Sequence, residues 1–347
     1  MSLKNLSVKI KIPKLLKHSL NNKRISRIYN NFEKSLNLDK NFIVAVSGGP
    51  DSLALAFLAK IYAVKKKLLL KCFIVDHKLR PESTKEANFT KRILKNISIN
   101  AQILTWKGKK PSRNIQSISR KKRYELLFKN SEKYKIKHIL LGHHQDDLLE
   151  NFFIRMLRGS GLKGLISLDK KNTIGNKHLL RPLLYEKKED LIFISKTVFK
   201  SFIEDPTNKN EKFKRIIIRE LIKKLQKNGL DKKKFLKTID NLKFSNKVVE
   251  YYVVENLKKN TFFSKKNDRL ILNNTFFLQP YEVIFRSLSE SIRMIGKKYY
   301  LARGKKVDKI IENLKKSVSY RSTLGGCIIE KVNESVIISK EYKNIRA

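Results

Sequence analysis

Short apolar runs alternate with stretches of helical character in the first part of the chain. The apolar runs are Phe42–Val46, Leu68–Val75, Ala101–Trp106 and His138–Leu141. The helical stretches between them are Ser52–Lys66, Thr84–Asn96 and Ile115–Tyr134. Runs that are apolar on both faces suit strands of a buried parallel sheet, and their alternation with helices is typical of an α/β fold. We therefore expect a parallel sheet covered by helices.

The pattern changes after Arg219. A Lys-rich stretch of helical character covers about residues 211–258. Three runs that favour strands follow it, at Arg269–Leu272, Gly326–Lys331 and Ser335–Ile338. The change predicts a domain boundary within residues 215–235. We expect a basic N-terminal extension over 1–30, an α/β domain over 31–218, and a basic, helical and partly β region over 219–347.

The charge of the chain is strongly positive. Its 347 residues include 78 Lys and Arg against 31 Asp and Glu, a formal net charge of +47, and the pI is near 10.2. Frequent Lys, Asn and Ile are typical of an AT-rich genome, which accounts for part of this excess. A field of this sign attracts polyanions, so the composition favours a nucleic-acid partner over a purely small-molecule one.

Cysteine usage and hydropathy indicate the compartment. Cys72 and Cys327 form neither a zinc pattern nor a disulfide framework, which fits a reducing cytoplasm. The sequence has no run of about 20 apolar residues, and Pro13 and several lysines interrupt its basic start. We therefore expect a cytoplasmic protein with no membrane span and no signal peptide. Monomer and homodimer are both left open.

The segment Ser47–Ser52, with the sequence SGGPDS, lies between an apolar run and a helical stretch. A strand that passes through two glycines into a helix gathers backbone N–H groups that bind anions. Gly48 and Gly49 permit the tight turn, and the two serine hydroxyls add donors. The carboxylate of Asp51 beside phosphates indicates Mg²⁺ or a cationic substrate. The segment lacks the lysine of a Walker A loop, and an ordinary capped strand–helix turn is the alternative.

A second polar segment, His143–Glu150, opens a predicted helix after the run His138–Leu141. Residues three and four apart share a helix face, so His143, Asp147 and Glu150 line up. This face offers carboxylates to Mg²⁺ or to an ammonium group. Helix capping by the acidic residues is one alternative. A zinc site is another, although the remaining histidines show no coherent ligand spacing.

A basic turn follows on the same predicted helix. Arg158 lies two turns beyond Glu150, from where it can reach a phosphate, and glycines at 159, 161 and 164 come next. A helix C-cap with Gly159 in the left-handed conformation is the structural alternative. The two interpretations are compatible.

With these motifs in order, the chain closely resembles the tRNA(Ile)-lysidine synthetase family over about residues 42–219. The SGGPDS segment by itself resembles the loop of the PP-loop ATP pyrophosphatases. The matching motifs are SGGPDS at 47–52, VDHKLRPES at 75–83, N-x-x-x-x-x-R-x-x-R-Y at 114–124, GHHQDDLLENFFIRMLRGSGLKGL at 142–165, RPLL at 181–184 and EDPTN at 204–208. One departure follows the last motif: Arg215 and Arg219 are kept, but Ile216 and Ile217 replace the family's usual Asn and Arg.

The resemblance implies a fold and a reaction. The fold is a PP-loop domain of the adenine nucleotide alpha-hydrolase-like class. ATP, with Mg²⁺, adenylates the C2 oxygen of the wobble cytidine in an isoleucine tRNA with a CAU anticodon, and pyrophosphate leaves. The ε-amine of free L-lysine then attacks C2, and AMP leaves. The product, lysidine, pairs with A and changes the tRNA from methionine to isoleucine specificity.

The resemblance also implies roles for individual residues. The catalytic residues are Asp51, Arg123, Asp147 and Glu150. The nucleotide-binding residues are Ser47, Gly48, Gly49, Pro50, Asp51, Ser52, His77, Arg80, His143 and Arg158. The metal ligands are Asp51 with Asp146 or Asp147. Arg120 shares a side of its predicted helix with Arg123, and surface charge is the alternative for both.

Three other functions fit parts of the sequence. A tRNA thiolase also adenylates a base carbonyl, but it needs positioned cysteines or an Fe–S cluster, and Cys72 lies inside a predicted strand. Amidating PP-loop enzymes need no basic C-terminal region and lack the block at 142–165. A non-catalytic RNA-binding protein has no use for an intact loop and acidic face.

Overall fold

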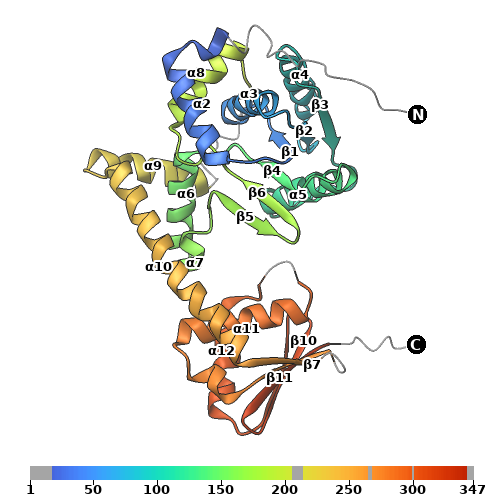
Figure 1. Ribbon diagram of the computed structural model, residues 1–347, viewed down its shortest axis with the longest axis vertical. Coiled ribbons are helices and arrows are strands. Elements are labelled where there is room, and N and C mark those ends of the chain that lie inside the picture. Colours follow the sequence, from blue (N-terminus) through green and yellow to red (C-terminus); the bar gives the residue numbers. More distant parts are fainter. Residues whose placement is uncertain (1–17, 205–213, 265–267, 299–300, 342–347) are drawn as a thin grey trace. The chain divides into compact units, whose positions relative to one another are not determined.

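The computed structural model describes residues 18–204, 214–264, 268–298 and 301–341 (Figure 1). The chain divides into two compact units, residues 1–232 and 233–347. Each unit has its own hydrophobic core and its own sheet.

The first unit is an α/β domain. Its helices are α2 Lys23–Leu36, α3 Pro50–Lys65, α4 Ser83–Lys95, α5 Ile115–Lys133, α6 Gln145–Met156, α7 Leu162–Leu165, α8 Lys188–Phe199 and α9 Lys214–Lys227. Its strands are β1 Phe42–Val46, β2 Leu70–Asp76, β3 Ala101–Thr105, β4 His138–Leu140, β5 Lys171–Ile174 and β6 Lys177–Leu180.

The six strands form one sheet in the order β3-β2-β1-β4-β6-β5. Neighbouring strands pair in parallel from β3 through β6, with Val44 opposite both Cys72 and Leu140. Only the edge strand β5 is antiparallel, because it forms a hairpin with β6. The expected parallel α/β sheet is therefore confirmed, whereas the β5–β6 hairpin was not expected.

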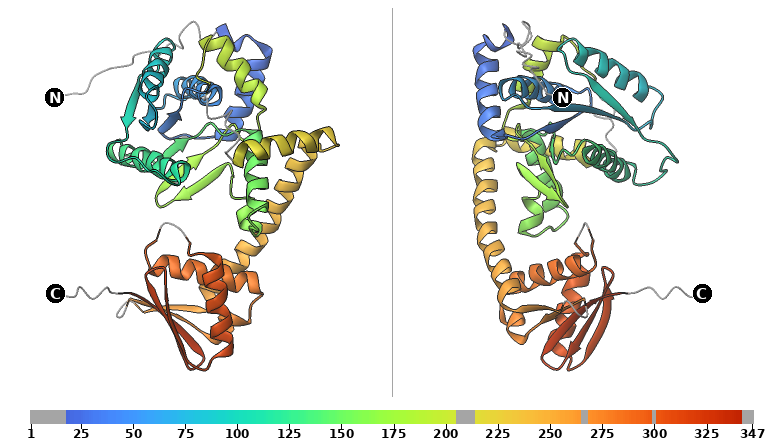
Figure 2. Two further views of the ribbon diagram at one scale, coloured as in Figure 1. Left: turned by 180° about the vertical axis from the view of Figure 1, so that it is seen from behind. Right: turned by 45° about the vertical axis from the view of Figure 1, so that its right-hand side comes forward.

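Alternating side chains of the strands build a core on each face of the sheet. Phe42 and Val44 of β1 belong to a core that also includes buried residues of α2, α3, α4 and α8. Ile43 points the other way, into a second core with Leu127 of α5. Figure 2 shows helices on both sides of this sheet. The burial of both faces explains why the strands read as continuous apolar runs.

The strand order creates a place for a ligand. β2 and β4 flank β1, so the connections that follow β1 and β4 leave the sheet in opposite directions. In open α/β sheets this arrangement leaves a crevice at the carboxyl ends of the two strands, where ligands bind. The segments 47–52 and 142–147 follow β1 and β4 at that edge.

The second unit combines an antiparallel sheet with helices. Its helices are α10 Lys232–Lys259, η2 Asn274–Leu278, α11 Tyr281–Ile295 and α12 Gly304–Lys316, and its strands are β7 Thr261–Ser264, β8 Arg269–Leu272, β9 Tyr320–Leu324, β10 Cys327–Val332 and β11 Ser335–Lys340. The first residue of α10, Lys232, is the last residue of the first unit. The sheet order is β7-β8-β11-β10-β9. Leu288 of α11 and Ile311 of α12 pack with Ile329 and Ile338 of the sheet.

The predicted strands of the C-terminal region are present, but α11 and α12 were not expected among them. None of the helices formed by the described residues is both long enough and apolar enough to cross a membrane.

Candidate active site

The SGGPDS segment forms a tight loop between β1 and α3. Gly48 has φ +88°, a left-handed conformation that favours glycine. The Ser52 hydroxyl accepts a hydrogen bond from the Ser47 backbone N–H at 3.1 Å and donates one to the Gly49 carbonyl at 2.9 Å. Pro50 is at the first helical position, where its fixed φ suits the start of a helix. The unpaired N–H groups of the first turn of α3 therefore face the loop and suit a phosphate.

Two residues from beyond α7 hold this loop in place. The Ser195 hydroxyl of α8 donates to the Pro50 carbonyl at 2.6 Å. The Ile203 backbone N–H donates to the Gly48 carbonyl at 3.0 Å. The loop carbonyls are thus satisfied by the protein, which leaves the N–H side of the loop for an anion.

The loop after β4 touches the loop after β1 backbone to backbone. A Cβ atom at Gly142 would lie 3.1 Å from the carbonyl carbon and oxygen of Asp51 and from Cα of Ser52. Only glycine fits there without displacing the backbone. This contact brings the acidic start of α6 beside the first turn of α3.

His144 lies between the two carboxylates that this contact brings together. Its side chain is 6% exposed, and its Nε2 lies 3.5 Å from Asp51 Oδ2 and 3.6 Å from Asp147 Oδ2. Its Nδ1 accepts a hydrogen bond from the Asp146 backbone N–H at 3.2 Å, so the ring proton is on Nε2. Its own backbone N–H donates to Asp147 Oδ2 at 3.0 Å, which completes a capping box. Asp147 therefore caps the helix as well as facing the site.

The electrostatics of this group favour a cation. Burial lowers the pKa of His144, but the hydrogen bond to Asp51 and the charges of Asp147, Asp51 and Asp146 outweigh burial and raise it. Asp51 Oδ1 is buried and has no hydrogen-bond partner among the described residues. A buried carboxylate oxygen without a donor is a natural ligand for a hard cation.

The described residues contain no cluster of three His, Cys, Asp or Glu side chains that could hold a metal. Mg²⁺ at a nucleotide needs no such cluster, because it commonly uses one or two carboxylates together with phosphate oxygens and water. Asp51 and Asp147 fit that requirement.

The other two carboxylates of α6 are paired with cations. Glu150 is 4% exposed, and its Oε1 lies 2.6 Å from Nε of Arg219 on α9. Asp146 Oδ1 lies 2.8 Å from the ammonium nitrogen of Lys232. Among the expected metal ligands, Asp146 is therefore paired with Lys232, whereas Asp51 and Asp147 lie against His144. These three carboxylates and that of Glu150 lie in one region.

A second group of expected site residues lies beyond β2. His77 packs edge-on against Trp106, with ring centroids 6.1 Å apart. Burial, and then the charge of Arg123, lower the pKa of His77 to about 4, with Lys110 adding to the effect and Asp76 opposing it. His77 and Arg123 are thus close enough to interact, and the histidine is neutral at pH 7. Arg120 and Arg123 both lie near the Tyr124 ring of α5.

Two expected nucleotide-binding residues, His143 and Arg158, lie outside α6, although their pattern placed them on that helix. His143 precedes α6 instead of lying on it, and its Nδ1 accepts a hydrogen bond from Arg181 at 3.2 Å. Arg158 lies in an exposed turn after α6, which ends at Met156, and Gly159 has φ +65° as the C-cap alternative predicted. Arg80 pairs with Glu86 of α4 at 2.9 Å.

Sequence reasoning missed four residues of this region: His144, Arg181, Arg219 and Lys232. His144 was considered only as a zinc ligand. Arg181 stood in the RPLL motif, and Arg219 was noted as kept, so both signals were available. Nothing in the sequence marked Lys232 among its lysine neighbours. Residues 205–208 of the EDPTN motif and the Arg215 side chain lie outside the described residues.

Comparisons with known proteins show the family of this chain. The family model of the PP-loop domain matches residues 18–225. The tRNA(Ile)-lysidine synthase of Wolbachia sp. subsp. Brugia malayi is 32% identical over 306 residues, covering 87% of this chain and 71% of the relative. The synthase of the same name from Orientia tsutsugamushi is 33% identical over 314 residues, covering 86% of this chain and 69% of the relative.

A solved structure shares the fold. The U34-tRNA thiolase of Methanococcus maripaludis superposes with a TM-score of 0.54 at 17% identity, over 63% of this chain and 78% of that one. That structure carries a 4Fe-4S cluster. Here Cys72 and Cys327 are both buried, one in each unit. From the family match and the relatives, the chain belongs to the tRNA(Ile)-lysidine synthase family, with a PP-loop domain over residues 18–225.

Proposed function

We propose that this protein is a cytoplasmic ligase that joins L-lysine to C2 of the wobble cytidine in an isoleucine tRNA with a CAU anticodon. The C2 oxygen attacks the α-phosphate of ATP, and pyrophosphate leaves. The ε-amine of lysine then bonds to C2 and loses a proton, while the C2–O bond breaks and AMP leaves. The product has lysine in place of the C2 oxygen, which changes codon and amino-acid specificity from Met to Ile.

Two observations carry the proposal. The chain matches its lysidine-forming relatives over most of its length, and the two loops at the sheet edge bring an anion site and two carboxylates together. A reaction that joins a nucleotide to a cationic amino acid needs both kinds of group. The thiolase alternative lacks a comparable observation, because burial raises the pKa of Cys72 to about 12 and that of Cys327 to about 11.

The loop and α5 supply the positive side of the adenylation step. First-turn N–H groups of α3 bind phosphate, and the guanidinium of Arg123 stabilises charge that develops as pyrophosphate leaves. His77 stays neutral beside Arg123 and shapes the nucleotide pocket. Ser47 and Ser52 keep the loop in shape through their mutual hydrogen bond at 3.2 Å.

The carboxylates supply the negative side. Asp51 and Asp147 are the residues that would hold Mg²⁺, since Asp51 Oδ1 is buried and receives no hydrogen bond from a described residue, and both carboxylates face His144. Bound there, Mg²⁺ supplies charge neutralisation at the phosphates of ATP. Asp146 already holds an alkylammonium, that of Lys232, which is the chemical group of the substrate lysine.

The substrate lysine has a carboxylate as well as two amines, and Arg219 of α9 is a candidate partner for that carboxylate. Arg219 is held by Glu150, and its side chain is 32% exposed. We propose that Arg219 binds the α-carboxylate of the substrate lysine and that the carboxylates at the start of α6 bind its ammonium group. The ε-amine must lose a proton before it attacks, and a carboxylate of that face accepts it.

Incorporation of radiolabelled lysine tests the function. The substrate is an isoleucine tRNA transcript with a CAU anticodon, with ATP and Mg²⁺, and a methionine tRNA with the same anticodon is the control. We expect label in the first tRNA alone, with one AMP and one pyrophosphate per lysine. ATP cleavage without label would contradict lysine as the nucleophile, and label in both tRNAs would contradict the discrimination.

Substitutions test the assigned residues. Asp51→Asn keeps the shape of the side chain but weakens its hold on Mg²⁺, so pyrophosphate release should fall by about 100-fold or more, a typical cost of losing one electrostatic partner. Glu125→Gln, an exposed carboxylate on α5, is the matched control. Unchanged circular dichroism would show that the fold survives. Full activity of Asp51→Asn would contradict the role of Asp51.

A further inference from the structure

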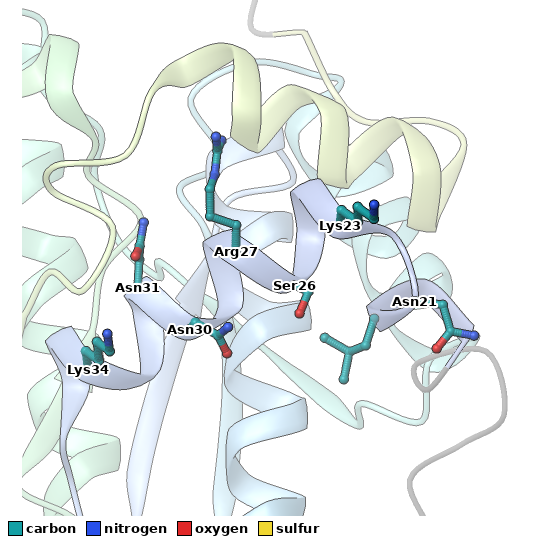
Figure 3. Close-up of a pocket in the computed structure, with 8 residues that line it drawn as sticks. Asn21, Lys23, Ser26, Arg27, Asn30, Asn31 and Lys34 are labelled. Carbon is teal, nitrogen blue, oxygen red and sulfur yellow. The ribbon is translucent and has the colours of Figure 1, made fainter.

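The outer side of α2 carries a hydrogen-bonding, cationic groove (Figure 3), and its lining includes no residue of the two catalytic loops. The groove has a volume of about 500 Å³ and is lined by Leu20, Asn21, Lys23, Ser26, Arg27, Asn30, Asn31 and Lys34. A second hollow of about 760 Å³ shares Lys23 and Arg27 and extends to α8. The first groove contains three cations and no carboxylate, and the proposed reaction uses none of its residues.

Ion pairs with α8 orient the two arginines of α2, Arg24 and Arg27. Asp190 of α8 is 5% exposed and pairs with two guanidiniums, with Arg24 at 2.6 Å and with Arg27 at 3.1 Å. The Glu186 carboxylate also interacts with the charge of Arg27, so the excess positive charge of the groove comes from Lys23 and Lys34. Lys23 and Lys34 are exposed and make no ion pair with any described residue. The helix therefore presents a net positive strip to solvent.

The length and chemistry of the strip select its partner. Lys23 and Lys34 lie 11 positions apart with Arg27 between them, or about 16 Å at 1.5 Å per residue, which is long enough to contact several phosphates of one RNA strand. Asparagine amides between the cations suit phosphate and ribose oxygens. A membrane-binding helix would expose an apolar face, whereas the apolar residues of α2, Ile25, Ile28 and Phe32, are fully buried.

We propose that the outward face of α2 binds the sugar–phosphate backbone of the tRNA, as a docking surface separate from the reaction site. The identity of the RNA rests on the proposed function. Phosphate contacts fix position without reading sequence, so the strip adds affinity while the reaction site provides discrimination.

The test removes the two lysines that make no ion pair. The variant Lys23→Gln/Lys34→Gln is compared with Lys85→Gln/Lys91→Gln, which removes the same charge from exposed positions on α4. At 0.15 M salt each lost phosphate contact removes a factor of about five in affinity, so KM for tRNA should rise about 10- to 30-fold. The slope of log Kd against log salt should fall by about two. The value of kcat should not change.

The outcomes separate this inference from the proposed function. If the wild-type protein incorporates no lysine, the proposed function fails. The affinities of the wild type and the variants for the tRNA transcript still test whether the strip binds RNA. If the wild-type protein is active and both variants bind tRNA alike, the inference is wrong. The reversed variant Lys23→Glu/Lys34→Glu should weaken binding further. A variant that loses binding to vesicles containing phosphatidylserine but keeps its KM for tRNA would point to a membrane instead and overturn the inference.

Discussion

Removing the partner of a buried charge is the sharpest perturbation of this fold. In Arg219→Met, Glu150 keeps its place in α6 but loses the guanidinium 2.6 Å away. Glu150 is 4% exposed, so water cannot replace that partner without opening the contact between α6 and α9. The methionine fills similar space and removes only the charge and the hydrogen bonds.

The size of the effect follows from burial. Removing one partner of a buried ion pair lowers the free energy of unfolding by about 3–5 kcal/mol. The Arg219 side chain is 32% exposed, so solvent screening reduces this to about 2–3 kcal/mol. For a unit of this size, that loss lowers the midpoint of thermal unfolding by roughly 5–10 °C.

The chain supplies its own reporter. Its single tryptophan, Trp106, is 5% exposed and belongs to the first unit, so its fluorescence follows the unfolding of that unit alone. Urea unfolding of Arg219→Met should show a lower midpoint with an unchanged slope. The matched control is Lys122→Met, which breaks a surface pair with Glu125 and should change stability by less than about 0.5 kcal/mol.

A double variant completes the argument. Glu150→Gln/Arg219→Met removes both charges, so it should be more stable than Arg219→Met alone by about 1 kcal/mol or more. If Arg219→Met unfolds like the wild type, or if the double variant is the less stable of the two, the buried pair does not stabilise α6 and α9 as argued.

Three further perturbations address other parts of the first unit and both cysteines. Gly48→Ala places a Cβ 2.4 Å from Thr90 Oγ1 at φ +88°, so it should cost about 1–3 kcal/mol and abolish pyrophosphate release; Gly49→Ala, at φ −73°, should leave stability unchanged, and equal losses of stability in the two would refute the loop geometry. His77 has a pKa near 4 in the folded protein and 6.5 in the unfolded one. Between these pH values the unfolded state binds more protons, so the free energy of unfolding falls as the pH drops from 6.5 to 4. After allowance for partial exposure of His77, we expect a loss of about 1–2 kcal/mol. Urea midpoints across that range should show this loss, and His77→Gln should lack it. Cys72→Ala/Cys327→Ala should keep its rate of lysine incorporation, because both thiols are buried and take no part in the chemistry; loss of activity in a folded double variant would reopen thiol chemistry.

The parallel sheet was predictable because its strands are buried on both faces. A strand such as β1 must then be apolar at successive positions, and a continuous run stands out in a sequence. The hairpin β5–β6 is an edge and carries polar side chains, so no run marks it. Its Gly175-Asn176 turn was a signal that went unused.

The helices of the second unit were missed for a different reason. Between Tyr281 and Ile295 the buried residues recur at helical spacing, as in Val283, Ile284 and Leu288. A search for helical periodicity finds this pattern, but the β-branched residues nearby favoured strands instead.

The candidate site was predictable in its parts but not in its pairing. The loop at 47–52 and the carboxylates of α6 are local motifs, so their chemistry is legible in the sequence. Which carboxylate meets which cation depends on contacts between distant segments: Glu150 meets Arg219, 69 positions away, and Asp146 meets Lys232, 86 positions away. The central position of His144 likewise required Asp51 from another element.

The glycine at position 142 has a consequence for motion during turnover. Because its backbone abuts that of Asp51 and Ser52, the phosphate loop and the acidic face share one wall. Neither can swing away from the other as a hinge without breaking that contact. Parting these two loops for substrate entry or product exit would therefore cost that contact, whereas a movement of other segments of the chain would not.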